Sequence, residues 1–142
     1  MALVLSGCGM SIPADPDGAL EQVENGVLRV GVSPDGPVVE RVGDEVSGPL
    51  ALVIEDFARQ HRADVEWEFG SEESLVMALE AGEIDIAIGG MTSDTPWSDR
   101  VGVSRGYPQL DPRERDLVVF VPLGQNRLLS ELERFLDGEG ER

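Results

Sequence analysis

Candidate binding residues gather at three points of this sequence, each close after a short apolar run. Glycine lets a ligand approach the backbone closely and exposes N–H groups, while hydroxyl and carboxylate side chains add hydrogen bonds and charge. Together these groups favour the binding of a small polar molecule. The residues that we expect to bind it are Asp35, Gly36, Gly89, Gly90, Met91, Thr92, Asp94, Trp97 and Tyr107.

Three of these residues favour a cationic ligand. Asp35 and Asp94 supply negative charge, and the indole ring of Trp97 supplies a π face. Two of them also have an alternative interpretation. Asp94 precedes Thr95-Pro96, which is good turn chemistry, so its carboxylate can cap a turn instead. Trp97 can be a hydrophobic plug on an exposed rim. Met91 likewise has packing as its alternative. The sequence leaves these alternatives open.

Short β-rich runs alternate along the chain with helical patterns. The pattern predicts strands over residues 27–32, 64–69, 83–88, 101–104 and 116–121. It predicts helices over residues 48–61, 71–82 and 126–138, and a small ribbon within 38–46. Strands separated by helices need crossover connections, so we expect an α/β fold: a single three-layer lobe with a mostly parallel sheet and helices on both faces. Ligands of such sheets bind beyond the carboxyl ends of the strands, where the candidate residues fall.

Composition excludes several functions. The chain has 142 residues with 11 basic and 28 acidic side chains, so the formal net charge is 11 − 28 = −17. The length suits one domain, and the charge disfavours nucleic-acid binding, which needs a basic face. Cys8 is the only cysteine and His61 the only histidine, which excludes an internal disulfide and a Cys/His zinc cluster. His61 lies on a predicted helix without a triad partner nearby, so we expect no enzyme, no metal and no cofactor.

The N-terminus resembles a processed export signal. Residues 1–8 read MALVLSGC, in which an apolar run and two small residues precede Cys8. This resembles the lipobox of bacterial lipoproteins, where such a cysteine receives the lipid. Residues 9–26 hold prolines, aspartates and glycines and predict a flexible tether, with one helical turn near residues 19–23. These features predict a lipid-anchored protein outside the cytoplasm; the alternative is an unstructured terminus with a chance cysteine.

The ordered set of motifs resembles the family 3 extracellular solute-binding proteins, the amino-acid-type receptors of ABC importers. The matching stretches are Leu28–Val32 with Asp35-Gly36-Pro37, the helix from Gly48, the strand Val65–Phe69, Leu79–Ile86, Gly89–Thr92 and Val101–Tyr107. The resemblance implies a lobe like those of the type II periplasmic binding proteins. It also implies a ligand at the strand ends.

The sequence departs from the family in two ways. The family inserts a second lobe after the position of Tyr107, whereas here only residues 108–115 fill that place. We therefore expect one lobe, residues 27–142, with a polar loop running over the surface where the second lobe is missing. The family's ligand-carboxylate arginine is replaced by Trp97, and its neighbouring threonine by Asp94. Arg100, three residues further on, could substitute for that arginine.

Two functions fit this sequence. The first is an extracytoplasmic solute-binding protein of a transporter, which captures a small polar or cationic solute alone or as a homodimer and serves an ABC transporter permease or other membrane protein. The second is a non-transporting interaction or sensory module, which uses the same face to contact a membrane protein or a second copy. A lone lobe should bind weakly, because small-molecule pockets usually bury about 70–90% of their ligand.

Overall fold

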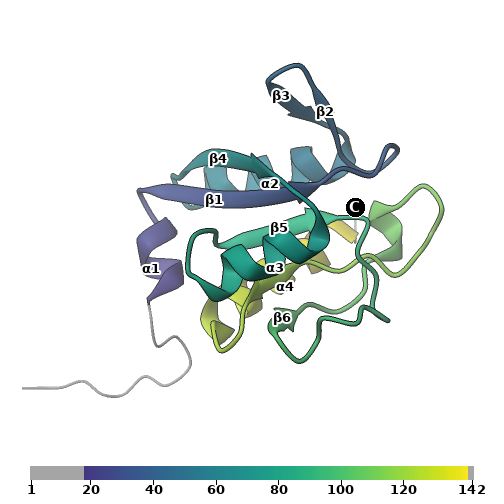
Figure 1. Cartoon of the computed structure of the whole chain (residues 1–142). Coiled ribbons are helices and arrows are strands. Elements are labelled where there is room, and N and C mark those ends of the chain that lie inside the picture. The colour runs from purple at the N-terminus through teal and green to yellow at the C-terminus, as the bar shows by residue number, and fades with distance from the viewer. Residues whose placement is uncertain (1–17, 141–142) are drawn as a thin grey trace, which may run out of the picture.

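The computed structural model describes residues 18–140, which form a sheet with helices on both faces (Figure 1). The helices are α1 (Ala19–Val23), α2 (Pro49–Gln60), α3 (Glu72–Glu80) and α4 (Asn126–Gly140), with a short 3₁₀ helix over Pro108–Leu110. The strands are β1 (Val27–Ser33), β2 (Glu40–Val42), β3 (Glu45–Ser47), β4 (Asp64–Phe69), β5 (Ile86–Gly89), β6 (Val101–Val103) and β7 (Phe120–Pro122).

The main sheet has five strands in the order β4-β1-β5-β7-β6. Strands β4, β1 and β5 pair in parallel, whereas β7 runs antiparallel to both β5 and β6. Four of the five strands therefore point the same way, which confirms the predicted mostly parallel α/β sheet. Strands β2 and β3 form the predicted ribbon as a separate antiparallel pair. The last strand lies in the same sheet as β1, with β5 between them.

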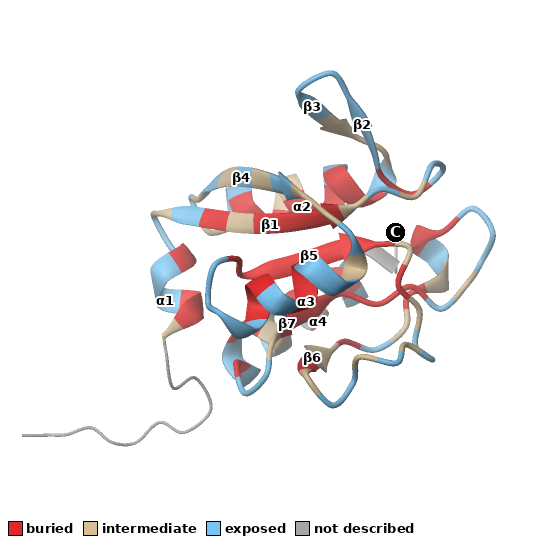
Figure 2. Cartoon of the chain, in the orientation of Figure 1, coloured by how far each residue is buried: buried red, intermediate tan, exposed pale blue. Residues whose placement is uncertain are grey.

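Side chains alternate between two hydrophobic layers on the two faces of the sheet. Figure 2 shows the buried positions on the strands and on the helices that cover them. In β1, Leu28, Val30 and Val32 face the layer that contains α2 and α4. Gly31 faces the other layer, where a Cβ atom would lie 2.6 Å from a methyl group of Leu75 on α3. The layer with α2 and α4 also takes in α1, while α3 covers the opposite face with β6 packed beside it.

Some element boundaries differ from the predicted ones. Strand β5 begins at Ile86 rather than at Glu83. Just before it, the Asp85 backbone N–H donates a 2.8 Å hydrogen bond to the carbonyl of Arg29, and its carboxylate accepts one of 2.8 Å from the Arg29 backbone N–H. In the last predicted strand, the Val119 N–H donates to the Ser104 hydroxyl, so regular pairing begins only at Phe120. Helix α4 does not end at Gly138, as predicted, but continues to Gly140.

The predicted tether is partly folded. Its expected helical turn is present as α1, and Leu20 and Val23 are buried against α4 and β1. The Asn25 N–H donates a 2.9 Å hydrogen bond to the carbonyl of His61, which ties the segment to the end of α2. The folded lobe therefore begins at α1 rather than at Val27. Cys8 and the rest of residues 1–17 lie outside the described residues.

Within residues 18–140, every helix is too short or too polar to cross a membrane.

Helix α1 contributes to the stability of the lobe. Leu20 is 4% exposed, whereas Leu52 on α2 is 63% exposed. We expect Leu20→Ala to lower the free energy of unfolding by about 2–4 kcal/mol, because it leaves a cavity. The matched Leu52→Ala control should change it by less than about 0.5 kcal/mol. Urea unfolding followed by circular dichroism measures both, and equal effects would contradict the packing of α1.

Candidate functional site

Asp35 lies in a tight turn just after the carboxyl end of β1. Its N–H donates to the carbonyl of Val39, and its own carbonyl accepts from the N–H of Val38, both at 2.8 Å. The carbonyl of Val38 accepts a hydrogen bond from Leu50 in the first turn of α2. The turn is therefore held by the helix that follows it, which fixes the position of the Asp35 carboxylate.

Two glycines at the end of β5 allow this carboxylate to come close. A Cβ atom at Gly90 would lie 2.3 Å from Oδ2 of Asp35, and one at Gly89 would lie 2.3 Å from the carbonyl oxygen of Ser33. Both distances are too short for any side chain. The structure thus brings the ends of β1 and β5 together, as the sequence predicted. A side chain at Gly89 would meet the backbone of Ser33, and one at Gly90 would displace the Asp35 carboxylate.

The loop of residues 108–115 lies beside this edge of the sheet (Figure 1). Arg113 and Arg115 each donate an Nη2 hydrogen bond to Oδ2 of Asp35, at 2.8 Å and 2.6 Å. These ion pairs hold the pKa of Asp35 below its usual value; the hydrogen bond from Arg113 contributes most, and burial opposes the shift. The expected ligand edge therefore already carries two guanidinium groups from the same chain.

A buried carboxylate anchors the loop. The side chain of Asp111 is fully buried, and it accepts hydrogen bonds from the Arg113 N–H at 2.8 Å, from the Arg113 Nε at 3.2 Å and from the Arg115 Nε. Burial alone would raise the pKa of Asp111, but these hydrogen bonds outweigh it and hold the pKa at about 2. The loop runs over the surface through residues 112–114, as predicted, but Leu110 and Asp111 are buried.

Thr92 and Asp94 lie together beyond the end of β5. The Thr92 hydroxyl donates a 2.5 Å hydrogen bond to Oδ1 of Asp94, and the Thr95 N–H donates to the carbonyl of Thr92. Asp94 thus takes part in a local turn, which was its alternative interpretation. Its carboxylate remains exposed.

Trp97 lies against α3 rather than beside Asp35. Its indole N–H donates a 3.1 Å hydrogen bond to Glu72, and its ring packs on the hydrophobic layer of α3. Arg100 lies 5.5 Å from the ring centroid and forms a two-point ion pair with Glu80. The contacts of Trp97 favour its packing interpretation, and Arg100 is engaged on α3.

Tyr107 and Met91 are buried in the core, which argues against their predicted role as ligand contacts. They are 3% and 2% exposed. The Tyr107 hydroxyl donates a 3.0 Å hydrogen bond to Asp137 on α4. Burial, together with this hydrogen bond, raises the pKa of Tyr107. Both side chains instead hold the segments around the site.

Asp111, Arg113 and Arg115 were not predicted as site residues. The available signal was the alternation of charge in DPRER, residues 111–115, but a run of charges in a loop is usually solvated. Only the fold shows that this run meets Asp35. Within the described part of the chain, residues 18–140, acidic, histidine and cysteine side chains form no group of three that could hold a metal ion.

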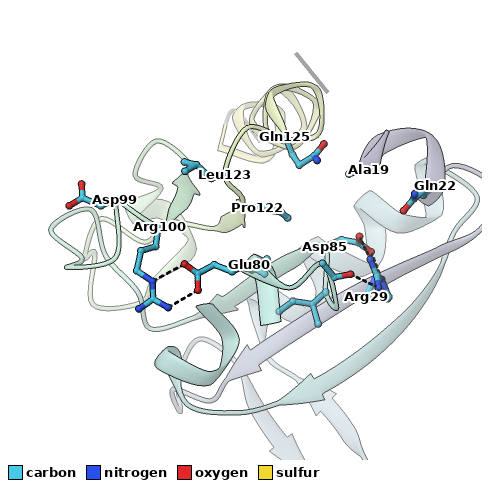
Figure 3. Close-up of a pocket in the computed structure, with 13 residues that line it drawn as sticks. Ala19, Gln22, Arg29, Glu80, Asp85, Asp99, Arg100, Pro122, Leu123 and Gln125 are labelled. Atoms are coloured by element: carbon cyan, nitrogen blue, oxygen red, sulfur yellow. Dashed lines mark hydrogen bonds and ion pairs between the residues drawn. The ribbon is translucent and has the colours of Figure 1, made fainter. Parts of the chain in front are cut away.

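A separate cavity of about 510 Å³ lies at the opposite end of the sheet (Figure 3). Two ion pairs face each other across it, Arg29 with Asp85 and Arg100 with Glu80. Asp99 also lines the cavity, so its charged lining holds three carboxylates and two guanidinium groups.

No family model matches the sequence, and no curated protein matches it either. Solved structures do match the fold. The arginine-bound domain 1 of TmArgBP, in a mutant form, aligns with a TM-score of 0.75 at 20% identity, covering 87% of this chain and 99% of that chain. An arginine-specific periplasmic binding protein of Salmonella typhimurium aligns with a TM-score of 0.68 at 13% identity, covering 82% and 94%.

A third similar structure is an ancestral cyclohexadienyl dehydratase, with a TM-score of 0.75 at 15% identity, covering 94% of this chain and 93% of that chain. The similar structures thus include binding proteins and an enzyme. At these identities the similarity shows the fold: an α/β lobe of the kind found in solute-binding proteins.

The hydrogen bonds that Asp111 accepts from Arg113 and Arg115, together called the Asp111 network, should control the stability of the fold in acid. A carboxyl group whose pKa is about 2 in the folded lobe and about 3.9 in the unfolded chain stabilises the fold above pH 5. That contribution, about 2–3 kcal/mol, is lost as the pH falls from 5 towards 2. We expect Asp111→Asn to lower the free energy of unfolding at pH 7 by about 2–4 kcal/mol and to flatten its dependence on pH in that window.

Asp44→Asn, in the exposed turn between β2 and β3, is the matched control because it changes the net charge equally. Urea unfolding at several pH values measures the effect. An Asp111→Asn profile parallel to that of Asp44→Asn would contradict the role of the network.

Proposed function

We propose that this chain is the solute-binding lobe of an extracytoplasmic receptor, and that it binds a small cationic solute at the edge formed by Asp35, Gly36, Gly89, Gly90 and Thr92. The observation that carries the proposal is the position of Asp35 on this fold. Its carboxylate lies at the carboxyl end of a parallel strand, next to glycine backbone, and it accepts hydrogen bonds from guanidinium groups. Hydrogen bonds between ionised groups are stronger than those between neutral groups, so a carboxylate in this position suits the recognition of a cation.

The similar structures support this proposal. Two of them are domain 1 of TmArgBP in its arginine-bound form, so a single lobe of this shape can be found with arginine. Another is the substrate-binding protein of an amino acid ABC transporter. By analogy with these proteins, we propose that the receptor delivers its solute to a membrane permease. Its activity is then binding rather than catalysis.

The second candidate, an interaction module, is favoured by one observation. Asp35 already forms ion pairs within the chain, so the same edge could contact a membrane protein or a second copy without binding a solute. A second copy would also cover a ligand that one lobe leaves open, which makes a homodimer compatible with either function.

Solute binding is tested by isothermal titration with L-arginine, L-lysine and putrescine, with thermal unfolding in parallel. A ligand at 100 times its Kd adds about 2.7 kcal/mol of stability, which raises Tm by several degrees for a chain of this length. We expect Asp35→Asn to weaken binding by about 10- to 100-fold, since it removes a hydrogen-bond acceptor that is charged.

Asp44→Asn is again the control and should bind as the native chain does. If the ligand that binds is unaffected by Asp35→Asn, then binding occurs elsewhere and the proposed site is wrong. An equal loss in both variants would show a general effect of charge instead.

We also propose that Cys8 carries a lipid anchor outside the cytoplasm. When the natural gene is expressed in a bacterial host with a clickable fatty acid, the native protein should be labelled and found with membranes. Cys8→Ser should abolish the label and release the protein, whereas Ser11→Ala should change neither. A label that persists in Cys8→Ser would refute the lipobox.

A further inference from the structure

The two guanidinium groups on Asp35 occupy the place that the proposed function gives to the solute. Both donate to the same oxygen, Oδ2, against which the backbone of Gly90 also packs. A carboxylate oxygen that already accepts two charge-assisted hydrogen bonds has little capacity for another. An incoming cation must therefore compete with the chain itself.

The loop is built to present both arginines on one side. Leu110 is buried and fixes its start, after the 3₁₀ turn Pro108–Leu110. Glu114 adopts a left-handed conformation, with φ at 59°, and its N–H donates a 2.7 Å hydrogen bond to the carbonyl of Asp111. This tight reversal between Arg113 and Arg115 turns both side chains towards the same pair of carboxylates.

Each arginine is held at two points of unequal strength. The Nε atoms of Arg113 and Arg115 donate to the fully buried Asp111, whereas their Nη2 atoms donate to Asp35, whose side chain is 25% exposed. Partly solvated ion pairs contribute less than buried ones, and breaking a buried pair costs much more. The contacts with Asp35 can therefore open while Asp111 keeps its partners.

We infer that residues 108–115 form an internal strap, in which Arg113 and Arg115 act as a built-in competitor for the solute site. The inference rests on the proposed function. A cationic solute binds when it displaces the two Nη2 atoms from Asp35, and the loop stays anchored through Asp111 and Leu110. The strap lowers the apparent affinity by the fraction of molecules in which it is open. It sets a threshold of solute concentration for binding at this edge.

The test is isothermal titration of L-arginine into the native chain and into Arg113→Gln/Arg115→Gln. We expect the double variant to bind about 10- to 100-fold more tightly, in line with the usual range of coupling between sites. Arg59→Gln/Arg134→Gln is the control. It removes the same charge from two exposed surface pairs, which involve Asp56 and Glu131, and should bind as the native chain does.

The double variant leaves Asp111 buried without cations, so it can lose stability. The triple variant Asp111→Asn/Arg113→Gln/Arg115→Gln removes the buried charge together with its partners, which keeps the buried group neutral. Circular dichroism confirms folding before each titration, and the triple variant should show the same gain in affinity.

The outcomes separate the two proposals. An affinity within about twofold of the native value in the folded double and triple variants overturns the strap and leaves the solute site intact. Saturable binding to these variants but not to the native chain supports both. The absence of L-arginine binding in all three overturns the strap as a competitor for this solute. L-lysine or putrescine binding in the same three proteins then decides whether the solute site itself survives.

Discussion

The buried carboxylate of Asp111 sets the arrangement of the whole carboxyl edge of the sheet. A charge removed from water is tolerated only when it is paired and hydrogen-bonded, and here the partners come from the next four residues of the chain. The chain must reverse at Glu114 to supply them. Because a guanidinium group has several donors in one plane, each arginine also has a nitrogen free to reach Asp35. One local constraint thus connects the loop to a turn at the other end of the sequence.

A comparable pair secures the opposite end of the sheet. Asp85 is buried and accepts hydrogen bonds from the backbone and the guanidinium group of Arg29, which fixes where β5 begins beside β1. At this end the charged groups line an open cavity, whereas at the carboxyl edge they bridge the loop to the sheet. The two ends of the sheet therefore differ: one holds a cavity, and the other is covered by the loop of residues 108–115.

This cover satisfies the polar groups at the carboxyl edge of the sheet. The ends of β1 and β5 would otherwise expose glycine backbone and an unpaired carboxylate to solvent. The loop satisfies the carboxylate with guanidinium groups, and the same chemistry defines which solute the edge can accept under the function that we propose. Under that proposal, stability and recognition depend on the same oxygen atom of Asp35. Any solute that binds there replaces a contact of the fold with a contact of its own.

The sequence by itself determined the fold class, because the signals for it are local. Alternating apolar residues in β4, the serine cap before α3 and the turn after β1 all lie within a few residues of what they specify. Gly89 and Gly90 were also predicted at the site, since glycine after a buried strand indicates a close approach. The late start of β5 and the folded α1 depended instead on contacts across the lobe. Only the tertiary structure decided that Tyr107 and Met91 are core residues, that Trp97 packs on α3, and that Arg113 and Arg115 meet Asp35. The physical reason is that hydrophobic periodicity acts along the chain, whereas an ion pair between residues about 80 positions apart exists only once the sheet has brought them together.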